Sequence, residues 1–373
     1  MAQPQLFTPI QVGGLPLNHR VVMPPLGRLR ASAAHVPGAL MAEYYAQRAS
    51  TPGTLLVAEA TMVAPRAAGY RHATAVWNDA QVQGWRVVTD NVHAQGSYIF
   101  LQLWAPGRQA GVDVLAEQGL PYVSASDVPL SSCPVAPRAL TLQEITEYVQ
   151  CYADAARNAM RAGFDGVELH GANGYLIDQF LQDVTNRRTD EYGGSIENRC
   201  RFALEVLQAV TEAVGEAKVG IRFSPWSTFG DMGMKDPKPT FAHLVTQIRE
   251  RFPSLAYIHV IEPRAEGDGI DRRAEKGESN DFLREIWKPR PFISAGGYTR
   301  ELALETAERT GDLIAAGRLF ISNPDLPLRW QMNVPADKGD RSTYYAIESP
   351  EGYIDYPFMN GEVAPERFRP VLN

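Results

Sequence analysis

Short apolar runs alternate with longer segments of helical periodicity along most of the chain. Eight runs have the length and the nearly continuous hydrophobicity of buried strands: Val21–Met23, Thr54–Ala58, Tyr98–Leu103, Gly166–Leu169, Val219–Phe223, Ala256–Val260, Phe292–Ala295 and Leu313–Ala316. Strands of this kind, separated by helices, are typical of a parallel sheet covered by helices. Eight such units predict a closed (β/α)₈ barrel of the TIM type, and we expect residues 1–373 to form it as a single domain.

Two of the intervening segments show clear helix boundaries. Gln143–Ala162 has helical periodicity and ends at the turn residues Gly163–Asp165, while a second helix is expected from the N-cap Ser195 to the stop at Gly215. The alternative architecture is an open, doubly wound sheet. That sheet would carry a G-x-G-x-x-G turn after its first strand, and neither this spacing nor a Walker A loop occurs in the sequence.

Three segments exceed a minimal barrel. Leu6–Leu17, with its Gly13-Gly14 turn, predicts an N-terminal β-hairpin that closes the bottom of the barrel. Ala105–Arg138 is rich in Pro, Gly and Ser and predicts a loop insertion after the third strand. Arg264–Glu278 is charged and contains glycine, which is typical of a flap after the sixth strand.

Polar residues and glycines gather where the predicted strands end. They are Pro25, Leu26 and Gly27 after strand one, Glu59 and Ala60 after strand two, Gln102 and Trp104 after strand three, His170 and Asn173 after strand four, Arg222 in strand five, Gly296 and Gly297 after strand seven, and Gly317 and Arg318 after strand eight. Because barrel enzymes carry their active sites at this end, we expect one shared site.

The residue types at this mouth restrict the chemistry. There is no lysine at a strand end for a Schiff base, no carboxylate pair for glycoside hydrolysis and no metal-type spacing of histidines, so we expect no metal. Glycine pairs after strands seven and eight suit a phosphate, with Arg318 as its counter-charge. Arg222 would face a ligand edge that becomes anionic, and the Gln102 amide would pair with a pyrimidine edge. Taken singly, the glycine pairs are equally consistent with tight turns and the two arginines with structural ion pairs. A lone His170 is more often a buried structural histidine than a catalyst.

Composition and charge point to small-molecule partners. The formal net charge of −7 provides no basic field for nucleic acid or anionic lipid, so we expect neither nucleic-acid nor membrane binding. Cys133, Cys151 and Cys200 are an odd number without a C-x-x-C spacing, which predicts free thiols. A cytoplasmic enzyme fits best, as a monomer or a homodimer.

Longer motifs resemble the old yellow enzyme family. They are His-Gly-Ala-Asn-Gly-Tyr-Leu at 170–176, Asp-Glu-Tyr-Gly-Gly-Ser-Ile-Glu-Asn-Arg at 190–199, Arg-Phe-Ser-Pro at 222–225, Gly-Arg at 317–318, Ile-Ser-Asn-Pro-Asp-Leu at 321–326 and Gly-Tyr-Ile-Asp-Tyr-Pro at 352–357. The likeness is collinear over nearly the whole chain. The stretches at 44–49 and 53–56 look most like the fungal branch, which includes reductases of alkaloid pathways and other secondary metabolism.

The resemblance implies a function and a set of site residues. It implies an FMN-dependent ene-reductase that holds FMN tightly but non-covalently and takes electrons from NADPH or NADH. The implied FMN-binding residues are Pro25, Leu26, Gly27, Ala60, Gln102, Arg222, Gly296, Gly297, Gly317 and Arg318. His170 and Asn173 would donate to the carbonyl oxygen of an α,β-unsaturated aldehyde or ketone, and Tyr175 would be the proton donor. Trp104, Phe229 and Tyr345 match positions that shape the substrate pocket.

The sequence departs from the family at three flavin positions. Gly27 stands where the family usually has Thr, Ala60 where it usually has Gly, and Gly297 where it often has Asn. These changes concern the tuning of the flavin more than its binding. Two other functions remain open: redox-neutral isomerisation or desaturation by the same kind of flavoenzyme, and a barrel that binds a ligand without turnover.

Overall fold

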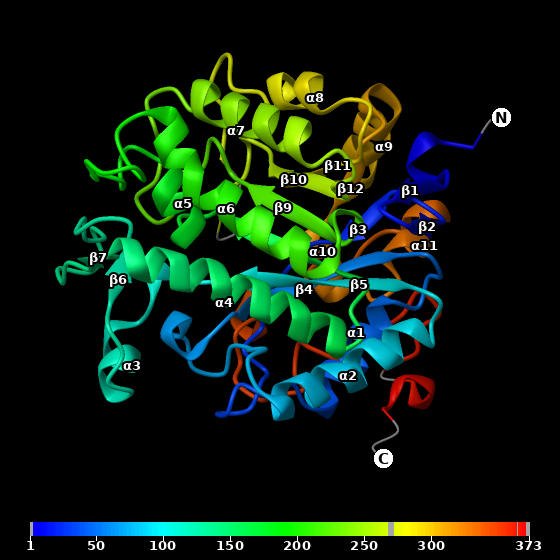
Figure 1. Cartoon of the computed structure of the whole chain (residues 1–373). Helices are drawn as coiled ribbons and strands as arrows, with labels where there is room; N and C mark the ends of the chain where they lie inside the picture. The colour runs from blue at the N-terminus through cyan, green and yellow to red at the C-terminus, as the bar shows by residue number, and fades with distance from the viewer. Residues whose placement is uncertain (1–2, 268–271, 364, 371–373) are drawn as a thin grey trace.

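The predicted strands close into a barrel in the computed structural model, which describes residues 3–267, 272–363 and 365–370 (Figure 1). All neighbouring strands are parallel, in the order β3-β4-β5-β8-β9-β10-β11-β12 and back to β3. The strands are β3 (Val21–Met23), β4 (Leu55–Met62), β5 (Tyr98–Trp104), β8 (Gly166–Gly171), β9 (Val219–Phe223), β10 (Tyr257–Ile261), β11 (Phe292–Ala295) and β12 (Leu313–Ala315). The predicted (β/α)₈ fold is confirmed.

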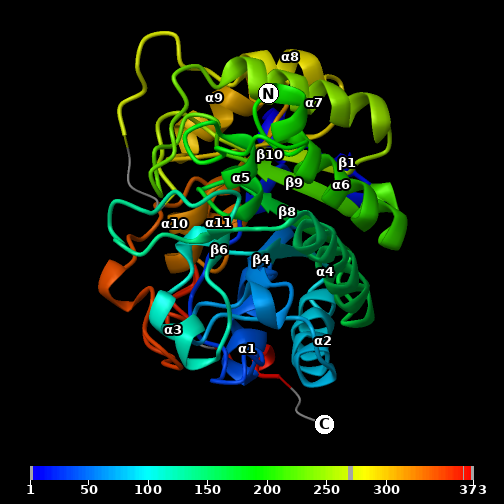
Figure 2. The same ribbon diagram turned by 60° about the vertical axis from the view of Figure 1, so that its left-hand side comes forward.

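Helices surround the barrel (Figures 1 and 2). They are α1 (Ala39–Arg48), α2 (Asp79–His93), α3 (Val112–Glu117), α4 (Leu142–Arg161), α5 (Leu176–Leu181), α6 (Ile196–Val214), α7 (Lys238–Arg251), α8 (Asp281–Trp287), α9 (Arg300–Thr310), α10 (Gly317–Ser322) and α11 (Leu326–Gln331). Both predicted helices are confirmed. In α6, the Ser195 hydroxyl accepts a hydrogen bond from the Asn198 N–H, and the helix ends before Gly215, whose φ is +91°.

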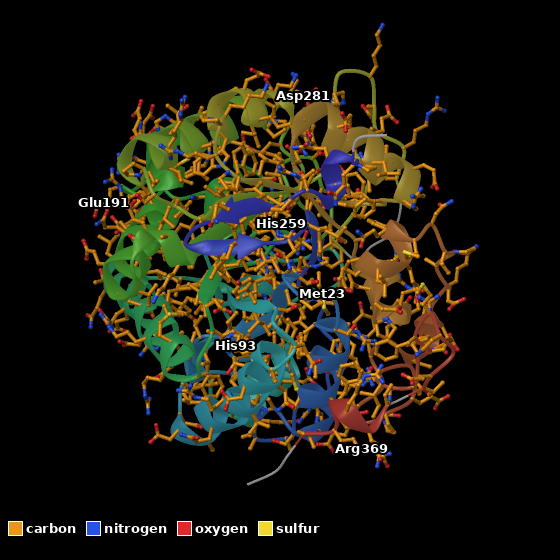
Figure 3. The ribbon with its side chains drawn as sticks, turned by 90° about the vertical axis from the view of Figure 1, so that its right-hand side faces the viewer. Met23, His93, Glu191, His259, Asp281 and Arg369 are labelled. Carbon is orange, nitrogen blue, oxygen red and sulfur yellow. The ribbon has the colours of Figure 1, made fainter. Side chains whose placement is uncertain are left out.

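The N-terminal hairpin lies at the bottom of the barrel, as predicted. β1 (Ile10–Val12) pairs antiparallel with β2 (Leu15–Leu17). The buried side chains of Val12 and Leu17 join the cluster that fills the barrel interior. Figure 3 views the molecule with the blue hairpin strands near its centre, close to the label of His259 on β10. The hairpin therefore seals the end of the barrel opposite to the carboxyl ends of the strands.

The insertion after β5 lies at that other end, and it has its own secondary structure. It contains α3 and a short parallel pair, β6 (Val123–Ser124) with β7 (Arg138–Ala139). Figure 1 shows β6, β7 and α3 on the left, remote from the hairpin on the right. The predicted flap at 264–278 lies partly outside the described residues. The part of the chain that the structure describes contains no helix long and apolar enough to cross a membrane, and its three cysteines are free thiols, as predicted.

The hairpin turn provides a test of the barrel seal. Gly13 has φ +56°, and a Cβ added there would lie 2.1 Å from the backbone oxygen of Ala217, whereas a Cβ at Gly14 would have no neighbour within 4 Å. We expect Gly13→Ala to reduce the free energy of unfolding by about 1–3 kcal/mol, the usual cost of overpacking. The matched control Gly14→Ala should change it by less than about 0.5 kcal/mol. Urea denaturation of both variants tests this, and equal effects would contradict the assigned role of the turn.

Candidate active site

One cavity of about 330 Å³ lies at the carboxyl ends of the strands. It is lined by all but one of the residues that the sequence assigned to the site: Pro25, Leu26, Gly27, Ala60, Gln102, Trp104, His170, Asn173, Tyr175, Arg222, Gly296, Gly297, Gly317, Arg318 and Tyr345. Phe229 is the exception. It does not line this cavity. Its ring lies next to Gly267, a residue that does line the cavity: a Cβ added at Gly267 would lie 2.9 Å from Phe229 Cδ1. The expected convergence on one mouth is therefore present, with Phe229 displaced from the wall.

Three local expectations about the site were wrong. Glu59 and Ala60 do not follow their strand: they lie inside β4, at a register shift between Ala58 and Thr61. Gln102 and Trp104 likewise lie inside β5 and do not follow it. His170 lies inside β8, one residue before its end, whereas Asn173 follows the strand in a left-handed conformation with φ +58°. An irregularity in a ladder and a positive φ are both common at active sites, since they re-aim side chains.

The loop that carries Asn173 is held by hydrogen bonds on both sides. The Asn173 N–H donates to the Ser224 hydroxyl over 2.7 Å, and the Asn173 carbonyl accepts from Gln109 Nε2 over 2.5 Å. The next residue, Gly174, donates its N–H to the Asp178 carboxylate. Tyr175 then forms the N-cap position of α5. Backbone anchoring of this kind leaves the side chains of Asn173 and Tyr175 available to the cavity.

Burial keeps both main titratable groups of the site uncharged. It lowers the pKa of His170 well below its usual 6.5, and the positive charge of Arg222 lowers it further. Burial likewise raises the pKa of the Tyr175 hydroxyl well above 10. The His170 ring packs edge-on against Tyr175, with centroids 4.8 Å apart. Near neutral pH the site therefore presents a neutral imidazole and a protonated phenol.

Below the cavity, a charged layer crosses the barrel interior. Glu168 on β8 is fully buried and accepts hydrogen bonds from Gln102 Nε2 over 2.8 Å and from His259 Nδ1 over 2.9 Å. Burial raises the pKa of the Glu168 carboxyl, but His259 and Arg222 outweigh this and hold it below its usual range. Because the Gln102 amide nitrogen donates to Glu168, the amide is oriented so that its carbonyl oxygen can accept a hydrogen bond in the cavity.

The far wall of the cavity is a C-terminal strap, residues 341–353, held by two arginines. Arg28 donates to the carbonyl oxygens of Tyr344 and Gly352 over 2.9 and 2.7 Å. Arg30 donates to the same Tyr344 oxygen and to those of Thr343, Ser349 and Glu351. Tyr345, which is 54% exposed, therefore stands at the rim of the cavity.

The cavity has the properties needed to hold FMN. Buried polar atoms on its walls have no hydrogen-bond partner in the described part of the chain: His170 Nδ1, Asn173 Oδ1, Arg222 Nε and Trp104 Nε1. Gly296 and Gly297 have φ values of +122° and +60°, and a Cβ at Gly317 would lie 3.1 Å from Leu26. Glycine thus lets the backbone approach a phosphate beside Arg318 at the start of α10. The residues of this cavity therefore fit FMN.

Other features bear on the ligand that this site accepts. A Cβ at Gly27 would have no neighbour within 4 Å, so the departure at this position leaves room in the cavity. Among the residues that the structure describes there is no group of three or more His, Cys, Asp or Glu side chains that could hold a metal. The buried donors and the glycines with positive φ on the cavity wall suit an organic cofactor.

Sequence reasoning missed the residues that support this site. Tyr70 packs on Trp104, Gln109 donates to the Asn173 carbonyl, and Glu168 accepts from Gln102. His259 acts through Glu168, and Arg28 and Arg30 hold the strap that carries Tyr345. One signal was readable: a Glu two positions before His170 falls on the same face of its strand, which directs a carboxylate into the barrel. The contacts of Tyr70 and Gln109 had no such signal, because Tyr70 lies in a loop and Gln109 ends a single 3-10 turn, Gly107–Gln109.

Comparison with known proteins identifies the class. The sequence profile described as the NADH:flavin oxidoreductase / NADH oxidase family matches residues 5–337. The chain is 51% identical over 363 residues to a chanoclavine-I aldehyde reductase of Penicillium roqueforti, covering 95% of this chain and 96% of that one. It is 46% identical over 367 residues to a probable inactive dehydrogenase of Claviceps purpurea, covering 96% of each. Fold, site and relatives together define a flavin oxidoreductase.

Solved structures agree. An old yellow enzyme from Pichia sp. superimposes with a TM-score of 0.89 at 36% identity, covering 98% of this chain and 96% of that one. Morphinone reductase does so with a TM-score of 0.88 at 40% identity, covering 96% and 97%. The chain belongs to the NADH:flavin oxidoreductase / NADH oxidase family, as an enzyme of the old yellow enzyme type.

A buried carboxyl on the cavity wall gives a prediction about pH. Burial raises the pKa of Glu59 from 4.5 to about 7, against hydrogen bonds from the Arg28 N–H and the Tyr45 hydroxyl. The native state then binds the proton more tightly than the unfolded chain, so this group's contribution to stability is present below pH 4.5 and is lost as the pH rises to 7. We expect the melting temperature of Glu59→Gln to rise relative to that of the wild type as the pH is raised from about 5 to about 8. Thermal unfolding at both values tests this, with the exposed Glu301→Gln as control; a pH-independent difference would refute it.

Proposed function

We propose that the protein is an FMN-dependent ene-reductase that uses NADPH or NADH to reduce the C=C bond of α,β-unsaturated aldehydes and ketones. One observation carries the proposal: two uncharged donors, His170 and Asn173, and a protonated phenol, Tyr175, line one cavity with the FMN-type residues. We further propose a cytoplasmic enzyme, monomeric or homodimeric, that acts on small molecules.

His170 and Asn173 bind and polarise the carbonyl group of the substrate. When FMN is bound, it supplies a hydride from N5 to the β-carbon. The carbonyl oxygen then gains negative charge, and preorganised neutral donors stabilise such charge most where water is excluded. A neutral imidazole suits this role, because its hydrogen bond strengthens as the carbonyl oxygen gains charge and so favours the transition state over the uncharged substrate. The same two donors would hold the carboxamide of the nicotinamide.

Tyr175 supplies the proton for the α-carbon. Its hydroxyl stays protonated at neutral pH because burial disfavours the phenolate. Its ring is fixed between the imidazole of His170 and the indole of Trp104, at centroid distances of 4.8 and 5.1 Å. Packing on two sides restricts the hydroxyl to one side of the cavity, as a general acid requires.

The remaining residues would hold the cofactor. Arg222 is buried at the cavity wall, and its Nε, which has no hydrogen-bond partner among the described residues, would donate to the flavin edge that becomes anionic. Gln102, oriented by Glu168, would offer its carbonyl oxygen to the pyrimidine ring. The phosphate would lie against the backbone of Gly296, Gly297, Gly317 and Arg318. Pro25, Leu26, Gly27 and Ala60 would form the wall beside the flavin, with Trp104 and Tyr345 limiting the substrate.

The names of the relatives support reduction of an aldehyde substrate. One relative is a chanoclavine-I aldehyde reductase and another, of Aspergillus flavus, is an NADP-dependent oxidoreductase that is 47% identical over 369 residues, covering 96% of this chain and 97% of that one. The Claviceps purpurea relative is named as probably inactive, so membership of the family does not by itself carry the activity. The proposal therefore rests on the donors and the phenol of this chain.

The function is tested by comparing the wild type with a variant that lacks both donors. Wild-type protein is expected to release FMN on heating and to reduce 2-cyclohexenone with consumption of NADPH. His170→Ala combined with Asn173→Ala should slow both flavin reduction by NADPH and flavin reoxidation by the enone, each by about a hundredfold or more, as for a lost oxyanion donor. Anaerobic stopped-flow absorbance measures the two half-reactions separately. Unchanged rates in both would remove these residues from the site, and release of FAD would overturn the cofactor assignment.

Tyr175→Phe separates the two half-reactions. We expect normal reduction of the flavin by NADPH, but roughly hundredfold slower reoxidation by an enone, because the general acid is lost. A nitroalkene should be affected less, since its nitronate product leaves the site unprotonated and takes its proton from water. Stopped-flow reoxidation with matched enone and nitroalkene substrates provides the measurement. Equal losses with the two substrates would exclude Tyr175 as the proton donor.

A further inference from the structure

A carboxylate inside the barrel lies next to the residues assigned to the cofactor. Glu168 on β8 is opposite Gln102 on β5 in the strand register, and Gln102 Nε2 donates to Glu168 Oε1 over 2.8 Å. His259 Nδ1 on β10 lies 2.9 Å from the other carboxylate oxygen, Glu168 Oε2. Both carboxylate oxygens of this residue, which has no exposed surface, thus have a partner within the barrel.

The hydrogen bonds around Glu168 indicate that it is ionised and that His259 is neutral. Gln102 Nε2 is a donor only, so a protonated Glu168 would have to donate to His259 Nδ1. His259 would then carry its own proton on Nε2, and an imidazolium would carry one there too. His259 Nε2 is buried without a hydrogen-bond partner in the described part of the chain, and a buried N–H without an acceptor is rarer than a buried acceptor without a donor. The proton therefore lies on His259 Nδ1 and the negative charge on Glu168; burial also lowers the pKa of His259 below 6.5.

Arg222 is the positive charge next to this carboxylate. It lies on β9 directly opposite His259 of β10, the residue that is hydrogen-bonded to Glu168. It also lies two residues beyond Gly220, which is opposite Glu168 in the register of β8 and β9. Residues two apart on a strand share a face, so Arg222 and Glu168 both point into the barrel. One positive and one negative charge therefore act on the same side of the cavity, whose wall includes Arg222.

We propose that Glu168 sets the redox balance of the cofactor site by opposing the charge of Arg222. This inference rests on the proposed function, in which Arg222 meets the flavin edge that becomes anionic on reduction. Arg222 favours negative charge at that edge and the Glu168 carboxylate disfavours it, so the site stabilises a reduced flavin less than Arg222 alone would. Glu168 does not line the cavity, so it acts through its charge and through Gln102, as a positioning residue.

Such a balance suits the proposed reaction, which has two opposed half-reactions. Stronger stabilisation of a reduced flavin favours hydride uptake from NADPH and disfavours hydride delivery to an alkene. Arg222 alone would shift the site towards uptake. A carboxylate held in the barrel interior, where water does not screen it, moves the site back towards delivery.

The test is Glu168→Gln, which removes the charge at nearly constant shape and leaves an amide that can accept from Gln102 and donate to His259 Nδ1. We expect this variant to bind reduced FMN, relative to oxidised FMN, about tenfold more tightly than the wild type does. For a two-electron couple a tenfold change corresponds to a midpoint potential about 30 mV higher. Anaerobic reductive titration of the holoprotein with an indicator dye of known potential measures this. Flavin reoxidation by 2-cyclohexenone should slow, whereas flavin reduction by NADPH should not.

The midpoint potential distinguishes this role from a structural one. A variant that merely disturbs the site weakens the binding of oxidised and reduced FMN alike, whereas the potential depends on the ratio of the two affinities. Glu168→Met is neutral and of similar volume but lacks the hydrogen bond to Gln102. It should raise the potential by a similar amount while weakening the binding of oxidised FMN to the apoprotein, and it replaces Glu168→Gln if that variant does not fold.

Two control variants should leave the midpoint potential unchanged. Glu43→Gln removes a buried carboxyl on α1, outside the barrel strands. His259→Asn retains an N–H donor for Glu168 and removes a ring that we infer to be neutral. A lower potential in His259→Asn would reveal an imidazolium at this position and overturn the inference. An unchanged or lower potential in Glu168→Gln with FMN bound would overturn this inference alone, whereas a wild type that lacks FMN or does not reduce an enone would overturn the proposed function.

Discussion

The buried carboxylate of Glu168 is the interaction on which the site is built. It lies inside the barrel with no exposed surface, where an unpaired charge is very unfavourable. Its partners come from other strands, Gln102 from β5 and His259 from β10, and the charge of Arg222 on β9 is close by. Each of these strands must hold its register for the carboxylate to be compensated. The floor of the cavity is therefore tied to the correct closure of the barrel.

Above this layer burial has a different result, because it outweighs the neighbouring charges. His170 stays neutral and Tyr175 stays protonated, although Arg222 lines the same cavity. The groups assigned to the substrate are thus dipoles, whereas the charged groups lie with Glu168 and with the residues assigned to the cofactor. This separation suits a reaction in which charge appears only during turnover, since dipoles favour the charged transition state over the uncharged ground state.

The sequence was sufficient for the barrel and for most of the cavity lining. Strand lengths and the caps Ser195 and Gly215 follow from neighbours within one element, which periodicity records. The register shift in β4, the left-handed Asn173 and the place of Phe229 were not readable, because they depend on contacts between elements. The packing of Tyr70 on Trp104 also joins segments far apart in the chain. Spacing along the sequence carries no information about such contacts. The residues assigned to the ligand were therefore found more readily than the residues that hold them in place.

The way in which the C-terminal strap is attached has an evolutionary consequence. The hydrogen bonds of Arg28 and Arg30 go to its main-chain carbonyls, which every amino acid provides. Among its side chains, the rings of Tyr344 and Tyr353 pack against these arginines. Point substitutions along 345–351 can therefore reshape one wall of the cavity without breaking its attachment to the barrel. The family profile ends at residue 337, before this strap begins. The molecules that this cavity accepts can thus be altered by single substitutions in the strap, while the residues at the ends of the barrel strands stay the same.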